Sequence, residues 1–147
     1  MSVSKNSEQI SEKEKRSKLG KRSKNKGAGY ERTIAKVFEK YTGVKLTRTP
    51  LSGGFARDKG ASKDFKGDIV CIEEGKDISL SIECKCHKTW SLPAWLRQSE
   101  EDAPEGRIPV VVFHQHNTSN DYIALSLEDF LSIVPPERIV RSTQNDD

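Results

Sequence analysis

Two carboxylates and a lysine stand at spacings that could assemble one hydrolytic site. Glu83 and Lys85 lie two residues apart in a run that alternates apolar and polar side chains. In a β-strand, both side chains would therefore leave the same face. Asp68 begins another apolar run, and we expect residues 68–72 and 78–86 to pair as a β-hairpin. Carboxylates brought together in this way repel each other, and a divalent cation between them removes the repulsion.

Such an assembly can hydrolyse a phosphodiester. Hard oxygen ligands suit Mg²⁺, with Mn²⁺ as a substitute. The cation would activate a bound water and polarise the phosphoryl oxygen, while Lys85 would orient or deprotonate the attacking water. The backbone carbonyl of Cys84 lies between Glu83 and Lys85 and is a further candidate ligand. The spacing alone is a weak signal, because an ordinary solvent-facing Glu and Lys also satisfy it.

Glu31 is a candidate for a third carboxylate at the site. It falls on or near the apolar stripe of a helix that the sequence predicts over residues 28–43. A lone carboxylate there is costly unless something pairs with it. A role at the site would explain the position, and a first-turn glutamate that favours the helix dipole is the alternative explanation.

The elements that must position these residues follow from the apolar pattern. A glycine ends the helix over residues 28–43. The later elements are predicted as strands at 44–48, 68–72 and 78–86, a helix at 92–103, strands at 108–114 and 121–125, and a helix at 127–134. This order predicts an α/β fold with a mixed central β-sheet flanked by helices.

The polar residues are concentrated at the start of the chain. Residues 1–27 carry nine Lys or Arg and three Asp or Glu, a net of +6, although the whole chain has only +3. Because this stretch has almost no apolar side chains to bury, we expect a disordered basic arm. The arm is either a solubilising tail or a segment that lies against phosphates. A single folded domain over 28–140 and a frayed tail over 141–147 would complete the chain.

Cysteine usage and hydropathy bear on the compartment. The chain has three cysteines, an odd number, and its first residues lack the apolar stretch of a secretory signal. Reduced thiols and a cytoplasmic location are therefore expected. No run of 18 apolar residues occurs, so we expect no membrane partner. In the predicted strand, Cys84 and Cys86 leave one face and His87 leaves the other. This separation argues against a shared zinc site.

Four motifs occur in a recognisable order. They are Tyr-Glu-Arg at 30–32, Arg-Thr-Pro-Leu-Ser-Gly-Gly at 48–54, Gly-Asp-Ile-Val at 67–70 and Ile-Glu-Cys-Lys at 82–85. In type and order they resemble the archaeal-type Holliday junction resolvases of the PD-(D/E)xK nuclease superfamily, over roughly residues 29–130. The resemblance implies a restriction-endonuclease-like fold, Mg²⁺-dependent cleavage of four-way or branched DNA, and a homodimer. Gly67 stands where the family's name-giving proline precedes the aspartate, which weakens the recognition more than the chemistry.

The resemblance also assigns roles to individual residues. Its acidic and lysine active-site positions match Glu31, Asp68, Glu83 and Lys85. Its DNA-contacting positions match Arg32, Arg48 and Ser52. Independently of the resemblance, the Gly-rich loop 52–66 has a composition that suits phosphate, and its candidate contacts are Arg57, Lys59 and Lys63. Two accessory residues complete the set: Gln98 from the resemblance, and His87 because it shares the face of Glu83 and Lys85.

Three classes of function remain open. The first is a structure-selective nuclease such as a junction resolvase. The second is a sequence-specific PD-(D/E)xK endonuclease of the homing or restriction type, since one fold serves many targets. The third is a non-catalytic DNA-binding module, with which intact carboxylates and a lysine fit poorly. A compact domain with a basic arm favours reading of shape and backbone, and hence the first class.

Overall fold

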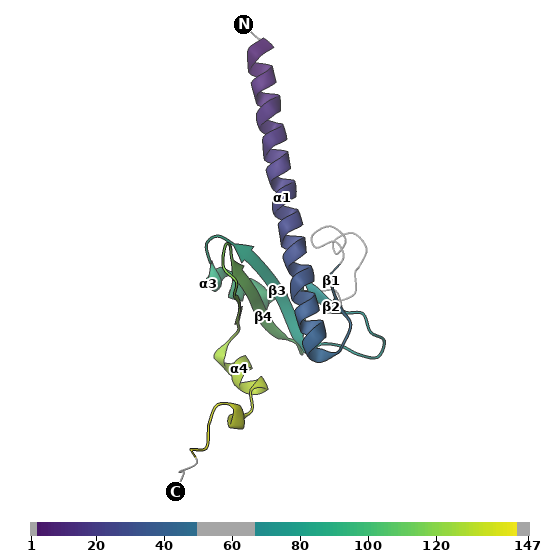
Figure 1. Cartoon of the computed structure of the whole chain (residues 1–147), viewed down its shortest axis with the longest axis vertical. Helices are drawn as coiled ribbons and strands as arrows, with labels where there is room; N and C mark the ends of the chain where they lie inside the picture. The colour runs from purple at the N-terminus through teal and green to yellow at the C-terminus, as the bar shows by residue number, and fades with distance from the viewer. Residues whose placement is uncertain (1–2, 50–66, 144–147) are drawn as a thin grey trace.

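The computed structural model describes residues 3–49 and 67–143 of the 147-residue chain. Its elements follow in the predicted order (Figure 1). They are α1 (Val3–Thr42), β1 (Leu46–Arg48), β2 (Ile69–Cys71), β3 (Leu80–His87), α3 (Leu92–Asp102), β4 (Ile108–Gln115), β5 (Asp121–Ala124) and α4 (Leu127–Ile133), followed by a 3-10 turn at Pro136–Arg138. This arrangement confirms the predicted α/β fold.

A three-stranded mixed sheet forms the centre of the domain. Strand β4 lies between β3, to which it is parallel, and β5, to which it is antiparallel. The parallel register places Glu83 opposite Val111 and Lys85 opposite Phe113. Strands β1 and β2 form a separate antiparallel pair.

The predicted hairpin between residues 68–72 and 78–86 is wrong. Strand β2 pairs with β1 instead, and β3 pairs with β4 over eight residues. The longer ladder wins because β4 is an apolar strand buried on both faces, which offers β3 more buried contact than the three-residue β2 could. Next to β2, one backbone hydrogen bond still joins this segment to β3: the Asp68 N–H donates to Ile82 O at 2.8 Å.

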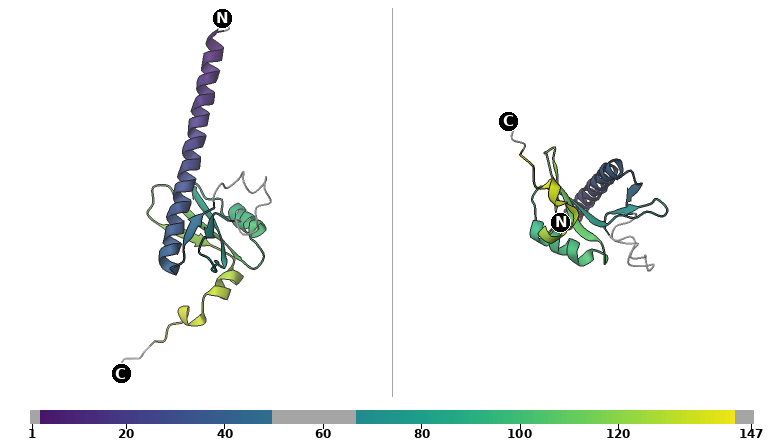
Figure 2. Two further views of the ribbon diagram at one scale, coloured as in Figure 1. Left: turned by 90° about the vertical axis from the view of Figure 1, so that its right-hand side faces the viewer. Right: turned by 90° about the horizontal axis from the view of Figure 1, so that it is seen from below.

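Two apolar clusters lie on opposite faces of the sheet. On one face, Ile34 and Ala35 of α1 pack against Ile82, Val110 and Val112. On the other face, Trp95 of α3 packs against Val111 and Phe113. Helices α1 and α3 therefore sandwich β3 and β4 (Figure 2). The alternation along β4 explains why its sequence is a continuous apolar run.

Helix α1 continues through the stretch that we expected to be a disordered arm. It begins at Val3, and every side chain from Ser11 to Lys26 is exposed. These residues bury nothing, as the sequence indicated, but helical hydrogen bonds are local and need no core. Lys, Arg and Glu are good helix formers and no proline interrupts them. At its other end the helix stops, as predicted, at Gly43, whose φ is +71°.

The chain leaves the sheet through α4, which Ser126 caps by accepting a hydrogen bond from Asp129 N–H at 3.1 Å. No residue of α4 is buried. Residues 141–143 form no regular element. Among the helices within 3–49 and 67–143, none combines the length and the apolar character needed to cross a bilayer.

Candidate active site

Glu83 and Lys85 leave β3 on the face that α3 covers. The Lys85 ammonium donates to Glu83 Oε1 at 3.0 Å and to Oε1 of Gln98, on α3, at 3.3 Å. The side chains of Lys85 and Glu83 are only 16% and 18% exposed. Strand alternation therefore predicted their shared face correctly, and Gln98, which the resemblance suggested as an accessory residue, lies beside the lysine.

Asp68 reaches the same site from the residue before β2. Its backbone is held on two sides, since its N–H donates to Ile82 O and its carbonyl accepts from Thr49 N–H, both at 2.8 Å. Its Oδ2 accepts a hydrogen bond from the backbone N–H of Cys84 at 2.7 Å. Cys84 lies between Glu83 and Lys85, so this bond fixes the Asp68 carboxylate at the edge of β3 beside both.

The electrostatics of Asp68 reflect this crowding. Burial raises its pKa to about 7 from an ordinary 3.8, and the negative charges of Glu83 and Glu31 act in the same direction. The hydrogen bond from Cys84 and the charge of Lys85 oppose the rise without cancelling it. A carboxyl whose pKa is raised by partial burial and by neighbouring carboxyls is characteristic of functional sites.

Gly67 explains why the name-giving proline is absent. Its φ is +90°, which a proline ring locked near −65° cannot adopt. A Cβ at this position would lie 3.2 Å from the carbonyl oxygen of Ile82. Glycine therefore lets the chain pass closely over β3 and bring Asp68 to the strand edge.

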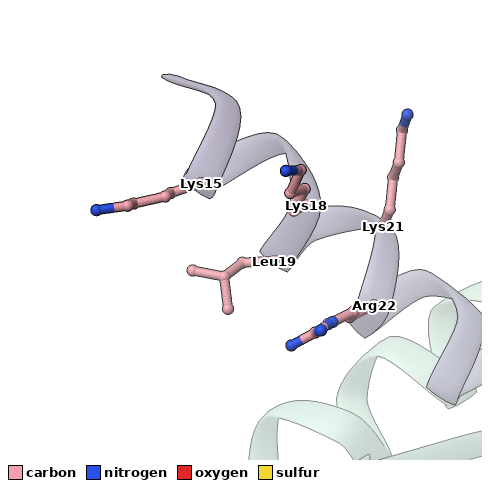
Figure 3. Close-up of a pocket in the computed structure, with 5 residues that line it drawn as sticks. All are labelled: Lys15, Lys18, Leu19, Lys21 and Arg22. Atoms are coloured by element: carbon pink, nitrogen blue, oxygen red, sulfur yellow. The ribbon is translucent and has the colours of Figure 1, made fainter. Parts of the chain in front are cut away.

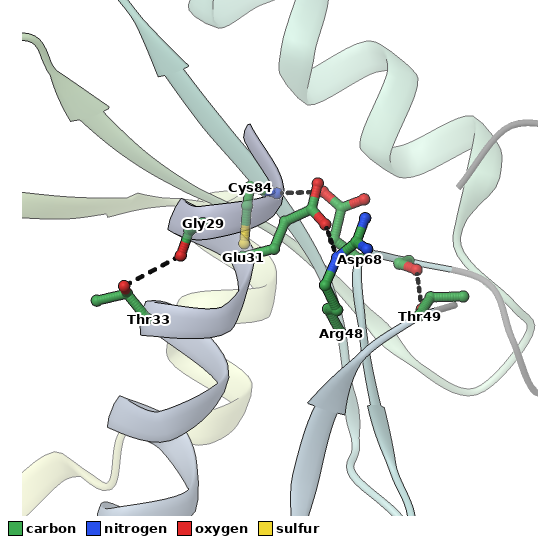
Figure 4. Close-up of polar contacts among 8 residues, drawn as sticks. Gly29, Glu31, Thr33, Arg48, Thr49, Asp68 and Cys84 are labelled. Atoms are coloured by element: carbon green, nitrogen blue, oxygen red, sulfur yellow. Dashed lines mark hydrogen bonds and ion pairs between the residues drawn. The ribbon is translucent and has the colours of Figure 1, made fainter. Parts of the chain in front are cut away.

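Glu31 is paired with an arginine. Arg48 Nε, on β1, donates to Glu31 Oε2 at 2.7 Å, and the two side chains are 24% and 13% exposed (Figure 4). This ion pair offsets the desolvation cost of placing a carboxylate on the packed side of α1. Arg48, predicted as a DNA contact, is thus placed between helix and strand next to Asp68, where its charge also neutralises the site.

Thr49 was not predicted. It is buried, and its hydroxyl donates to the carbonyl oxygen of Gly67 at 2.7 Å. Together with its backbone bond to Asp68, this contact holds the segment that carries the aspartate. The sequence offered no signal for it, because a threonine before a proline has the composition of an ordinary loop.

The donor set suits a hard divalent cation in its chemistry. Asp68 and Glu83 supply carboxylate oxygens, and a protein binds Mg²⁺ through one or two of these while waters fill the remaining positions. A strand residue's N–H and C=O point to the same edge, so the Cys84 carbonyl lies on the edge that its N–H shares with Asp68. Glu31 and Glu83 are engaged with Arg48 and Lys85, and in the described part of the chain no three acidic, His or Cys side chains close around one point.

Of the other predicted residues, Arg32 and His87 are described, and neither contacts this group. Arg32 is exposed on α1. The exposed ring of His87 lies 5.4 Å from that of Trp95, centroid to centroid, and is not brought to the carboxylates. Four predicted DNA contacts fall outside the described residues: Ser52, Arg57, Lys59 and Lys63.

The cysteines are free thiols, and Cys84 faces the core. Its sulfur points toward α1, on the face opposite Glu83 and Lys85 (Figure 4). Burial raises the pKa of this thiol, and the charge of Asp68 adds to the rise. Cys84 therefore contributes its backbone to the site, and its side chain stays protonated and inert.

The chain matches one known protein family across most of its length. The family, described as "Phage putative PDDEXK endonuclease", matches residues 22–145. The matched range contains Glu31, Asp68, Glu83 and Lys85. A comparison with curated proteins found no match.

Proposed function

The chain belongs to the phage PDDEXK endonuclease family, and on that premise we propose that it is a Mg²⁺-dependent endodeoxyribonuclease that cuts four-way or branched DNA as a homodimer. One observation carries the proposal. A half-buried Asp68, held by the Cys84 N–H and with its pKa raised to about 7, lies beside Glu83 while Lys85 contacts that glutamate. Two carboxylates and an ammonium in this relation can hold a metal ion and a water against a phosphodiester.

Asp68 and Glu83 are the side chains that would hold Mg²⁺, or Mn²⁺ in its place, together with the Cys84 carbonyl. When bound, the ion supplies Lewis-acid stabilisation of charge on the phosphoryl oxygens and activation of water. The Cys84 N–H keeps the Asp68 carboxylate aimed at this edge. Arg48 neutralises Glu31, which limits the negative charge that a phosphate meets on entering.

Lys85 is the residue that would handle the attacking water. Its ammonium carries three protons and sits between Glu83 Oε1 and Gln98 Oε1. Gln98 Oε1 accepts a hydrogen bond from one of these N–H groups and thereby limits the rotation of the ammonium. A remaining N–H can orient water toward the phosphorus and stabilise the charge that develops on it.

The preference for branched DNA rests on the ordered motifs around the site and on the compact connections between described elements. Without large recognition insertions among those elements, contact with shape and backbone is favoured over contact with bases. A four-way junction has two-fold symmetry, so one nick on each of two strands requires two active sites.

Exposed apolar side chains on β5 and α4 support the proposed homodimer. Strand β5 has β4 as its neighbour on one side, and α4 follows it. Large side chains are exposed here, including Tyr122, Ile123, Leu127, Phe130 and Leu131. A cluster of exposed apolar residues beside a strand edge is typical of a surface that another chain covers.

The decisive test is incubation of the protein with four-way, forked and linear duplexes in Mg²⁺. Paired symmetric nicks on the four-way substrate alone would support the proposal. A unique cut in long linear DNA would identify a sequence-specific enzyme, and binding without any cut would identify a DNA-binding module. Asp68→Asn and Glu83→Gln should abolish cutting and keep DNA binding. The matched control, Glu74→Gln, changes an exposed carboxylate of the β2–β3 connection and should cut normally.

A further inference from the structure

Helix α1 carries a strongly charged surface outside the active site. We call residues 11–26 the basic segment. It holds eight Lys or Arg and two Glu, and all of its side chains are exposed. Its cations are Lys13, Lys15, Arg16, Lys18, Lys21, Arg22, Lys24 and Lys26. Nothing in the catalytic group described above uses them.

The basic segment and the active site share one uninterrupted helix (Figure 1). Glu31 lies on the same helix, nine residues after Arg22 and sixteen after Lys15. At a rise of 1.5 Å per residue, these cations stand about 14 to 24 Å from Glu31 along the axis. One turn of DNA spans about 34 Å, so a duplex that runs from the site along α1 would reach the basic segment within one turn.

Side-chain contacts connect Lys26, the last residue of the basic segment, to the end of the sheet. The Lys26 ammonium lies 3.3 Å from Nδ1 of His116, and Nε2 of that ring lies 3.2 Å from the Cys86 carbonyl oxygen. A ring with its proton on Nε2 satisfies both contacts, since it accepts from Lys26 and donates to the carbonyl.

A second contact between α1 and the sheet is made by Tyr30, one helical turn after Lys26. The Tyr30 hydroxyl donates to Asp121 Oδ1 at 2.9 Å, and His114 Nδ1 lies 3.0 Å from the same oxygen. Burial and the Asp121 carboxylate raise the pKa of Tyr30, which keeps its hydroxyl proton in place for this bond. With both contacts made, the helix leaves the domain in a direction that the sheet determines.

The composition of the segment identifies the kind of partner that it fits. Lys15, Lys18, Lys21 and Arg22 lie within one turn of Leu19 along the helix, with the side chain of Lys21 directed away from the leucine (Figure 3). Leu19 is 64% exposed and is the only large apolar residue of the segment. A helix that lies on a membrane or in a protein groove needs an apolar face, which is missing here. A helix with cations distributed around it and no such face suits the phosphates of a nucleic acid.

We propose that the basic segment binds the phosphate backbone of the DNA duplex being cut, and that α1 holds this duplex at a fixed angle to the active site. The identity of the ligand as the substrate duplex rests on the proposed function. The site supplies the chemistry, and the segment supplies electrostatic affinity that does not depend on base sequence.

The first test measures DNA binding against salt in an Asp68→Asn background, so that no substrate is consumed. The variant Lys18→Gln/Lys21→Gln/Arg22→Gln removes three cations of the segment. Its control, Lys36→Gln/Lys40→Gln/Lys45→Gln, removes three exposed cations near the far end of α1. Each phosphate contact contributes about 0.9 to the slope of log affinity against log salt. We expect the segment variant to lose about two to three from the magnitude of this slope, and the control to lose less than about one.

Equal slopes for the two triple variants would overturn the proposal. So would binding of the wild type to phosphatidylserine vesicles that is lost in the segment variant while the DNA slopes stay equal. Failure of the proposed nuclease function shows separately, as a wild-type protein that cuts none of the DNA substrates in Mg²⁺.

The second test concerns the fixed angle. Gly27 lies in the helix, and a Cβ added to it would meet nothing within 4 Å, so Gly27→Ala fits without a clash. Gly27→Pro keeps every charge and removes a helical hydrogen bond between the segment and the domain. We expect Gly27→Pro to raise Kd and lower the salt slope, and Gly27→Ala to match the wild type. Equal binding by the two variants would show that continuity of the helix has no role, and circular dichroism verifies that the domain is folded in both.

Discussion

The backbone N–H of Cys84 donates to Oδ2 of Asp68 at 2.7 Å. This bond joins two segments that share no ladder, because the β2 that follows Asp68 pairs with β1 while β3 pairs with β4. The geometry of the candidate site therefore depends on a few contacts around Asp68, and the first predictions concern those contacts.

The stability of the metal-free protein should depend on the ionisation of Asp68. Its folded pKa of about 7 is above the ordinary 3.8, so the folded state holds the proton more tightly than the unfolded chain. The resulting stabilisation is complete below pH 3.8 and is lost as the pH rises through 7. In EDTA, we expect Tm to fall by several degrees between pH 5 and pH 8 because of this group. Asp68→Asn keeps the acceptor for Cys84 and should show a smaller fall, and an equal fall in both proteins would refute the assignment.

Gly67→Ala should damage both stability and cleavage. The residue has φ of +90°, and a Cβ would press against Ile82 O at 3.2 Å, so we expect a loss of roughly 1–3 kcal/mol in the free energy of unfolding. Gly75→Ala is the matched control, because its φ is +72° but nothing lies within 4 Å of its Cβ position. That variant has only the cost of a positive φ, about 1–2 kcal/mol, and should cut normally. Urea denaturation and a cleavage assay measure the two effects, and equal losses would show that the approach to β3 is unimportant.

The pair Arg48–Glu31 should show strong energetic coupling. Removing the arginine leaves Glu31, which is 13% exposed, without its partner, so Arg48→Met should destabilise the protein more than Arg48→Met/Glu31→Gln does. A double-mutant cycle should give a coupling energy of about 1–3 kcal/mol. The pair Arg107–Asp77 is a useful comparison, because Asp77 is 65% exposed and its coupling should stay below about 1 kcal/mol. Similar couplings for the two pairs would contradict this expectation.

Lys85 and Gln98 should differ in their effects on cleavage. Lys85→Met removes the donor that we propose faces the reacting phosphate, and it should lower kcat by about 10² to 10³. Gln98→Ala removes only a group that positions the ammonium, and its loss should be smaller, about tenfold, with partial rescue by Gln98→Glu. Glu100→Ala changes an exposed residue of the same helix and should leave kcat unchanged. Single-turnover cleavage gives the three rates, and a Gln98→Ala rate equal to that of Lys85→Met would make Gln98 more than a positioning residue.

How much of this site the sequence predicts depends on the range of the contacts involved. The shared face of Glu83 and Lys85 follows from strand alternation, which is a local property. The stop at Gly43 and the apolar β4 also follow from local patterns. The position of Asp68 does not, because it depends on bonds to Ile82 and Cys84, which are distant in the chain. The hairpin prediction failed for this reason, since it assigned neighbours in sequence as neighbours in the sheet.

Helix α1 presents the complementary case. The sequence correctly indicates that residues 11–26 have nothing to bury, yet burial is not required for a helix whose hydrogen bonds are internal. The arginine partner of Glu31 was equally hidden, because the carboxylate and Arg48 meet only when β1 packs against the helix. The sequence indicates that Glu31 needs a partner, and the fold shows that this partner is Arg48.

Because α1 is continuous, the number of residues between the basic segment and the domain determines the direction in which the cations point. One residue inserted between Arg22 and Lys26 would turn the upstream cations by about 100° about the axis and advance them by only about 1.5 Å. Seven inserted residues would restore the orientation to within about 20° and move the cations outward by about 10 Å. Because Lys18, Lys21 and Arg22 lie within about 100° of one another around the axis, most changes in length would turn these three cations away from the proposed duplex. Insertions spaced about two turns apart would instead move them to phosphates further along it.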